Sequence, residues 1–132
     1  MNRFSRIISA GLLASALGLS ACDPGLDSRQ IIARVVSPDG KRDAIYATNL
    51  GGGATVGPYE EVFVVDRGAS LQMSERVASL ERVCHLDVRW LDDDLIEITY
   101  FARRATEDRS VSRPASVAVR YRWLGRDAAN GC

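Results

Sequence analysis

The fold is decided by residues 86–100, which read LDVRWLDDDLIEITY. Apolar and polar residues alternate along both halves of this stretch, the apolar ones being Leu86, Val88, Trp90, Ile96, Ile98 and Tyr100. A period of two places one kind of side chain on each face of a β-strand, so both halves predict half-buried strands. The connection Leu91–Asp94 is short and polar, and it therefore predicts a hairpin.

The same pattern extends outward in both directions. Residues 117–123 alternate apolar side chains with Ala118 and two arginines, which predicts another half-buried strand. Toward the N-terminus, the sequence Ser-Pro-Asp-Gly at 37–40 separates residues 31–36 from residues 44–50. Proline fixes φ and glycine accepts a positive φ, so these four residues predict a second hairpin.

The middle of the chain completes the predicted sheet. Residues 61–66 are apolar on both faces, which predicts a central strand. Within residues 68–83, four side chains fall at helical spacing, Met73, Val77, Leu80 and Cys84. Residues 76–80 fit a short strand equally well, and we favour the strand. The sequence thus predicts an all-β protein, a single small antiparallel meander or sandwich-like domain of about six or seven locally joined strands after an N-terminal signal helix.

The N-terminal segment resembles a bacterial lipoprotein signal. Arg3 and Arg6 form a positive head, an apolar and small-residue core follows, and Leu19-Ser20-Ala21-Cys22 is similar to a lipobox, at which the cysteine thiol is acylated and the preceding residues are removed. A transmembrane helix is the alternative, but it needs about 20 mainly apolar residues. This run ends at Asp23 and is interrupted by glycines and serines. An ordinary secretory cleavage is the other alternative.

These features divide the chain into a signal peptide at 1–21, a polar tether at 22–30 and a β domain at 31–132. Seventeen basic and seventeen acidic residues balance in the full chain, and removal of the signal takes away two arginines and no acid. The arginines are scattered among acids rather than gathered in a stripe, which argues against nucleic acid as a partner. Asp23 resembles the enterobacterial signal for inner-membrane retention, but which membrane holds the protein stays open.

Cysteine usage agrees with export. Once Cys22 is acylated, Cys84 and Cys132 remain as a pair, and an oxidising compartment favours a disulfide between them. A metal site or a redox thiol is the alternative, as is a different partner for the terminal Cys132. Two distant cysteines and the single His85 do not form a zinc ligand set, and the chain contains no Cys-x-x-Cys.

The two hairpins also carry a resemblance to a family. Residues 37–46, 53–55 with the Glu-Glu-Val-Phe-Val-Val that follows at 60–65, and 88–100 are similar to an uncharacterised family of small bacterial envelope lipoproteins. The resemblance implies an all-β fold and a location in the cell envelope. It implies no activity, substrate or catalytic residue.

Three further groups invite a chemical interpretation. His85 and Ser79 could form a nucleophile–base pair, but no third group is identified by spacing. Asp92–Asp94 are three successive acids without the alternating ligands of a calcium loop, so a solvated turn is the better interpretation. Gly51–Thr55 lacks the Gly-Lys-Ser/Thr of a phosphate loop and instead indicates a flexible connection that could dock on a partner beside Tyr59 and Phe63.

The strand aromatics, Trp90, Tyr100, Tyr121 and Trp123, fit core packing, with ligand stacking as the alternative. We therefore predict no catalytic, metal-binding or cofactor-binding residue and no enzymatic activity. The chain is expected to be a membrane-anchored lipoprotein, facing the periplasm or the exterior, that acts as an interaction module for an envelope protein partner. A small-ligand-binding protein or weak hydrolase of the periplasm is the alternative.

Overall fold

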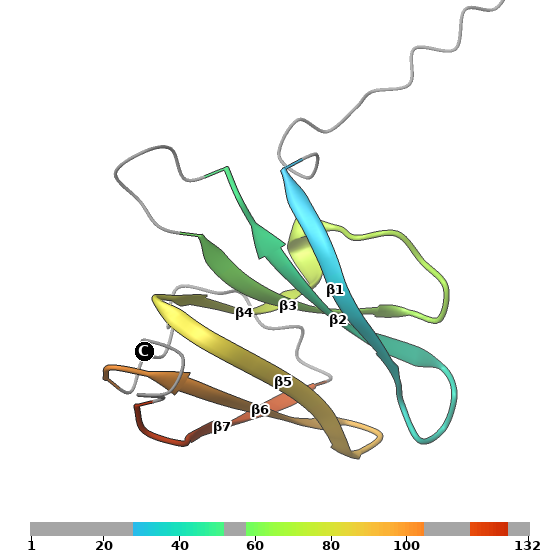
Figure 1. Cartoon of the computed structure of the whole chain (residues 1–132). Coiled ribbons are helices and arrows are strands. Elements are labelled where there is room, and N and C mark those ends of the chain that lie inside the picture. The colour runs from blue at the N-terminus through green and yellow to red at the C-terminus, as the bar shows by residue number, and fades with distance from the viewer. Residues whose placement is uncertain (1–27, 52–57, 105–116, 127–132) are drawn as a thin grey trace, which may run out of the picture.

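The computed structural model describes residues 28–51, 58–104 and 117–126. Seven strands and one 3₁₀ helix follow in chain order: β1 (Arg29–Val36), β2 (Arg42–Asn49), β3 (Tyr59–Asp66), η1 (Met73–Glu75), β4 (Arg76–Glu81), β5 (Val83–Asp92), β6 (Leu95–Ala102) and β7 (Ala118–Trp123). A four-stranded sheet, β1-β2-β3-β4, faces a three-stranded sheet, β5-β6-β7 (Figure 1). The predicted all-β sandwich-like fold is confirmed.

Both predicted hairpins are present. β1 pairs antiparallel with β2, and β5 with β6. In the first turn, the amide of Gly40 donates to the carbonyl of Ser37 at 2.9 Å, and Gly40 has a φ of 73°, which explains the glycine. β1 begins at Arg29, two residues before the predicted start of the domain.

The last strand differs from the prediction. β7 pairs with β6 in parallel, with Ile98 opposite Tyr121 and Tyr100 opposite Trp123. The antiparallel, locally joined arrangement expected for every strand is therefore wrong for this pair. A parallel pair needs a connection of a dozen or more residues, and the chain between Ala102 and Ala118 has that length.

The main core fills the space between the sheets. Its members come from both sheets: Ala44, Val62, Val64, Val77, Ala78, Leu80, Leu86, Val88, Ile96, Ile98, Tyr100, Ala102 and Val117. A second, smaller cluster lies on the outer face of the four-stranded sheet, where Ala69 and Leu71 of the β3–β4 connection pack against Ile45, Ala47, Phe63 and Val65. β3 is thus buried on both faces, and its predicted central position is confirmed.

Residues 68–83, for which the sequence allowed either a helix or a strand, contain a 3₁₀ helix and a strand. Residues Met73–Glu75 form one 3₁₀ turn, and β4 then pairs with β3. The favoured strand at 76–80 is correct because Val77–Leu80 are buried and complete the sheet edge.

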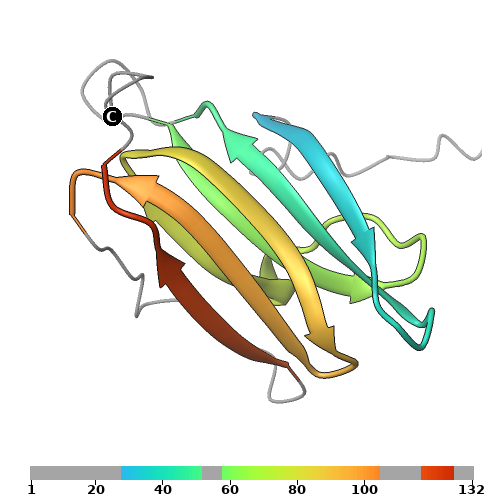
Figure 2. The ribbon, with the colours of Figure 1, turned by 60° about the horizontal axis from the view of Figure 1, so that its bottom comes forward.

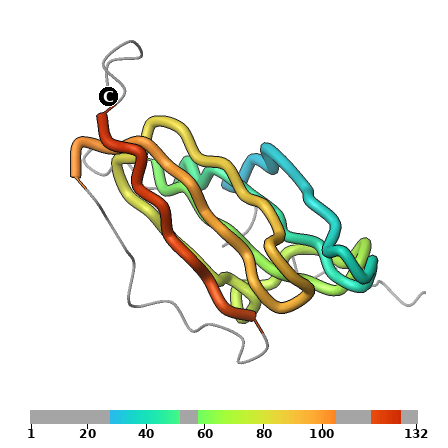
Figure 3. The backbone as a smooth tube through the Cα atoms, turned by 90° about the horizontal axis from the view of Figure 1, so that it is seen from below, coloured from blue at the N-terminus to red at the C-terminus, as the bar shows by residue number. Residues whose placement is uncertain are grey.

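The strands run along the length of the sandwich, and turns lie at its two ends (Figures 2 and 3). The hairpin end comprises the turns at residues 37–41 and 93–94. The terminal end comprises the start of β1, the ends of β6 and β7 and the turn at Arg82, which joins the two sheets. Ser28 and Arg126, the first and last described residues, both lie at the terminal end.

Candidate functional site

A buried carboxylate with two arginines lies on the outer face of the four-stranded sheet. Side chains alternate between the two faces along β3, so Glu61 lies on the same face as Phe63. The side chain of Glu61 is 1% exposed. The guanidinium of Arg29 donates to both carboxylate oxygens, with Nη2 at 3.2 Å from Oε1, and Nη1 of Arg76 donates to Oε1 at 2.6 Å. Three strands are therefore joined through one carboxylate.

Arg29 is held from a second direction as well. Its guanidinium carbon lies 5.9 Å from the ring centroid of Phe63, and its side chain is 4% exposed. Such burial is tolerable for charges only because they are paired and hydrogen-bonded. The cluster fixes the first residue of β1, and so it fixes the point at which the chain enters the domain.

A second buried acid on this face holds the β3–β4 connection. Oδ2 of Asp43 accepts a hydrogen bond from the amide of Gly68 at 2.9 Å and one from Nη1 of Arg34 at 2.6 Å. The Gly68 amide, followed by Arg34, holds the pKa of Asp43 below its usual range despite the opposing effect of burial. Arg34 also donates to the carbonyl of Ala69, so the connection is held over the small outer core.

Polar groups also meet at the edge of the main core. The hydroxyl of Thr48 donates to Oε2 of Glu60 at 2.7 Å. Burial, followed by a hydrogen bond to Glu60, raises the pKa of Tyr46 well above its usual value. The phenol is therefore a neutral donor at neutral pH and unsuited to act as a base.

The hairpin end is closed by contacts between the two turns. The amide of Asp39 donates to Oδ1 of Asp93 at 2.8 Å, and Arg42 donates to the carbonyl of the same residue. The guanidinium of Arg42 lies 5.5 Å from the ring centroid of Trp90, whose indole nitrogen donates to the carbonyl of Val35 at 2.9 Å. These contacts join the edge of one sheet to the edge of the other.

The predicted nucleophile–base candidates are separated between the sheets. Ser79 is buried in β4 opposite Glu61, whereas His85 is exposed in β5 opposite Phe101. The imidazole lies 6.4 Å from the Phe101 ring, centroid to centroid. Among the described residues, no hydrogen bond joins His85 to Ser79, so the geometry does not support the pair.

The three successive aspartates form the predicted turn. Oδ1 of Asp92 accepts from the amide of Asp93, and the carbonyl of Asp94 accepts from the amide of Ala118 at 2.8 Å. Within residues 28–51, 58–104 and 117–126, no group of three or more His, Cys, Asp or Glu side chains is placed to hold a metal ion. The turn therefore ties β5, β6 and β7 together.

The glycine-rich loop is only partly described, since residues 52–57 lie outside the described residues. At its start, a Cβ on Gly51 would lie 2.8 Å from Oγ of Ser28, so a side chain there would require the Ser28 hydroxyl to move. Phe63 is fully buried in the outer core, so its side chain is not available to a partner that docks on this loop.

The four strand aromatics divide into two groups. Tyr100 is buried, and Trp90 and Tyr121 pack against the main core, as predicted. Trp123 is 45% exposed because it stands at the end of β7. Its indole nitrogen donates to the carbonyl of Ala102 at 3.0 Å, which fixes a half-exposed ring at the terminal end.

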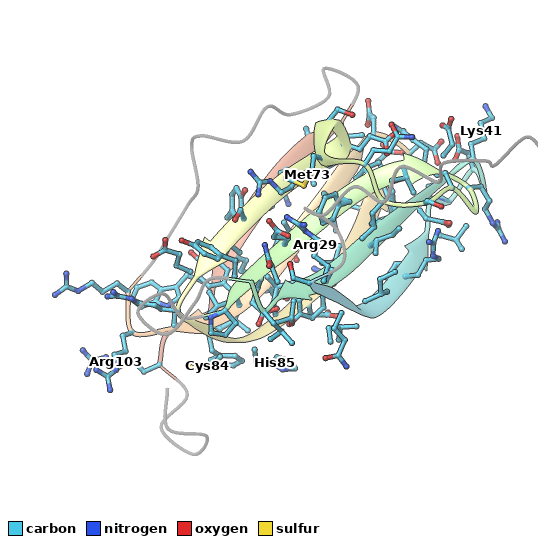
Figure 4. All side chains as sticks on the ribbon, turned by 90° about the horizontal axis from the view of Figure 1, so that it is seen from above. Arg29, Lys41, Met73, Cys84, His85 and Arg103 are labelled. Carbon is cyan, nitrogen blue, oxygen red and sulfur yellow. The ribbon has the colours of Figure 1, made fainter. Side chains whose placement is uncertain are left out.

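The predicted cysteine sites lie mainly outside the described residues, since Cys22 and Cys132 are not among them. Cys84 is exposed at the start of β5 (Figure 4), where the register shifts between Val83 and His85. This bulge turns two successive side chains, those of Cys84 and His85, outward.

The terminal end carries exposed residues that sequence reasoning missed. Four arginines are exposed there, and we call them the end arginines: Arg82, Arg103, Arg104 and Arg126. In the described part of the chain, none of the four forms an ion pair. Leu50, Trp123 and Leu124 stand at the same end, 63%, 45% and 44% exposed. The residues are scattered along the sequence, so only the topology brings them together.

No protein-family model, curated protein or solved structure matches this chain. The resemblance to small envelope lipoproteins therefore stays a prediction. Within the described residues, no helix has both the length and the apolar character needed to cross a membrane.

Proposed function

We propose that this protein is a lipoprotein of the bacterial cell envelope, held to a membrane by acylated Cys22, and that its β-sandwich is an interaction module for an envelope protein. The observation that carries this proposal is the short, firmly fixed entry to the domain. Only five residues lie between Cys22 and Ser28, and the six steps from one Cα to the next allow a reach of about 20 Å. Arg29 is then locked by Glu61. The domain therefore stays close to the bilayer and meets partners at the membrane surface.

The filled space between the sheets favours binding of a protein over binding of a small ligand. A ligand site is typically a concave pocket with a few converging polar groups. Here the facing surfaces are occupied by packed aliphatic side chains and by Tyr100, which is 2% exposed. Apolar side chains are instead exposed on the edge strand β1, where Ile31 and Ile32 are each 50% exposed.

The edge strand also limits how a partner can bind. β1 has a β-bulge, seen as a register shift between Ile31 and Ala33. The carbonyl of Val35 already accepts a hydrogen bond from the indole N–H of Trp90. A bulge and a capped edge discourage indiscriminate strand pairing. The proposal therefore places the partner against the exposed side chains of Ile31 and Ile32, in the half of β1 nearer the membrane, rather than in a strand paired along this edge.

A disulfide between Cys84 and Cys132 belongs to the same proposal. Gly125 accepts from the amide of Ala102, which pairs with Val83 beside Cys84. Two strand spacings of about 4.8 Å separate these positions, and the seven residues from Gly125 to Cys132 can span more than twice that distance. Cys132 can thus reach Cys84.

Fractionation of cells that express Cys22→Ser tests the anchor. The wild-type protein should sediment with membranes, and the variant should be released or remain as unprocessed precursor. Unchanged, processed variant in the membrane fraction would contradict the anchor.

Cross-linking of the membrane-held protein tests the interaction module. Loss of the cross-linked partner in Ile32→Glu, but not in Lys41→Glu at the hairpin end, would support it, and equal capture by both variants would overturn the assignment to β1.

A further inference from the structure

We infer that the terminal end of the sandwich lies against anionic phospholipid headgroups of the same bilayer that holds Cys22. This inference rests on the proposed lipid anchor and adds the face and the lipid chemistry that the anchor alone does not specify. Chain length limits which surface can be involved. Because Ser28 belongs to the terminal end and lies six residues from Cys22, this end is the one that the tether brings to the membrane.

Charge separates the two ends of the sandwich. The end arginines, Arg82, Arg103, Arg104 and Arg126, are exposed, and among the described residues Glu81 is an exposed acid beside them. The hairpin end exposes Asp39, Asp66, Asp92 and Asp94 against Lys41 and Arg67. Figure 4 places Arg103 and Lys41 at opposite extremes of the molecule. An anionic surface therefore attracts the terminal end and repels the other.

Apolar side chains at the terminal end fit the interface between headgroups and acyl chains. The ring of Trp123 is half exposed while its N–H is already bonded to the carbonyl of Ala102. Leu124 follows it, and Leu50 projects from the end of β2 on the opposite sheet. Tryptophan is enriched at membrane interfaces because its ring is amphipathic. Guanidiniums pair well with phosphate because they offer forked donors. The terminal end combines an exposed tryptophan with arginines that can pair with lipid phosphates.

The two tryptophans of the chain make the orientation measurable. Trp123 lies at the terminal end, and Trp90 packs against the core near the hairpin end. The lipidated full-length protein is reconstituted into vesicles of phosphatidylcholine with phosphatidylglycerol, with or without brominated acyl chains, and flotation establishes that it is membrane-bound. Fluorescence is measured for Trp90→Phe, which reports Trp123, and for Trp123→Phe, which reports Trp90. The wild type is measured too, so that the comparison survives if Trp90→Phe unfolds.

We expect brominated lipid to quench Trp123 strongly and Trp90 little. Arg103→Glu with Arg104→Glu should remove most of this quenching without reducing flotation, and so should vesicles of phosphatidylcholine alone. Lys41→Glu, the matched charge reversal at the hairpin end, should leave it unchanged. Flotation with equal quenching of both tryptophans, or of neither, would overturn the inferred orientation while leaving the anchor intact. Failure to float would overturn the anchor and, with it, this inference.

Discussion

At the hairpin end the two sheets are joined by hydrogen bonds between turns, whereas at the terminal end they are joined by the chain itself, which turns at Arg82 from β4 into β5. The hairpin end uses its charged groups internally, through Asp93 and Arg42. The terminal end leaves its four end arginines without an ion pair among the described residues and exposes Trp123. The hairpin end thus keeps charged groups in contacts between the two sheets, whereas the terminal end leaves four arginines and a tryptophan exposed to a surface.

The largest effect should follow when the buried tie near the terminal end is broken. Glu61→Gln removes the charge that pairs Arg29 with Arg76 and leaves two guanidiniums poorly compensated. We expect a loss of about 3–5 kcal/mol in the free energy of unfolding. Urea unfolding measures it, with Glu81→Gln at the exposed end of β4 as the control, which should change stability by less than about 0.5 kcal/mol. Equal stability of the two variants would contradict the buried tie.

The proposed disulfide between Cys84 and Cys132 would be a second tie at the terminal end. Cys84→Ser should lower stability by about 2–4 kcal/mol, because the bond to Cys132 would close a loop of about 48 positions in the unfolded chain. Thermal unfolding under oxidising conditions measures the loss. The variant should then match the wild type in reductant. A variant that melts at the temperature of the oxidised wild type would argue against the pairing.

The two tryptophans compare the ends directly. In the absence of membranes, Trp90→Phe should cost about 1–2 kcal/mol, because it removes the hydrogen bond to Val35 and weakens the contact with Arg42. Trp123→Phe should cost less, since its ring is half exposed and loses only the bond to Ala102. The reverse order in urea unfolding would mean that the terminal end, not the hairpin end, is the more rigidly closed.

The smallest effect concerns pH. The pKa of Asp43 lies below its ordinary value of 3.8 in the folded protein, chiefly through the Gly68 amide and then Arg34. Its contribution is therefore complete above pH 3.8 and is lost as the pH falls through the lower folded-state pKa. Asp43→Asn should flatten the acid side of the stability profile. A mutant profile parallel to that of the wild type below pH 3.8 would contradict this role.

A second titrating group acts with the opposite sign. Burial, followed by the charge of Asp66, raises the pKa of Glu75. Ionised Glu75 therefore opposes folding above its raised pKa, and stability is regained as the pH falls through it. Glu75→Gln separates this effect from that of Asp43.

Much of the fold could be predicted because local sequence determined it. Alternation at 86–100 and the turn at 37–40 specify hairpins through contacts between near neighbours. The parallel β6–β7 pair could not be read this way, because alternation is the same in either direction. The length of the chain between the strands was the available signal.

The charged groups were harder to predict for a related reason. Glu61 lies on the same face of β3 as Phe63 and Val65 and is buried there, but its partners Arg29 and Arg76 come from other strands. Likewise, the end arginines are brought together by topology rather than by spacing. Exposure of Trp123 depends on where β7 ends, which alternation alone does not fix.

The central claim is that acylated Cys22 holds this domain at a membrane, and the intact mass of the protein extracted from cell membranes tests it most directly. We expect a chain that begins at Cys22 and is heavier than residues 22–132 by the mass of the attached lipid. A chain that carries no lipid, or that begins at any other residue, would contradict it.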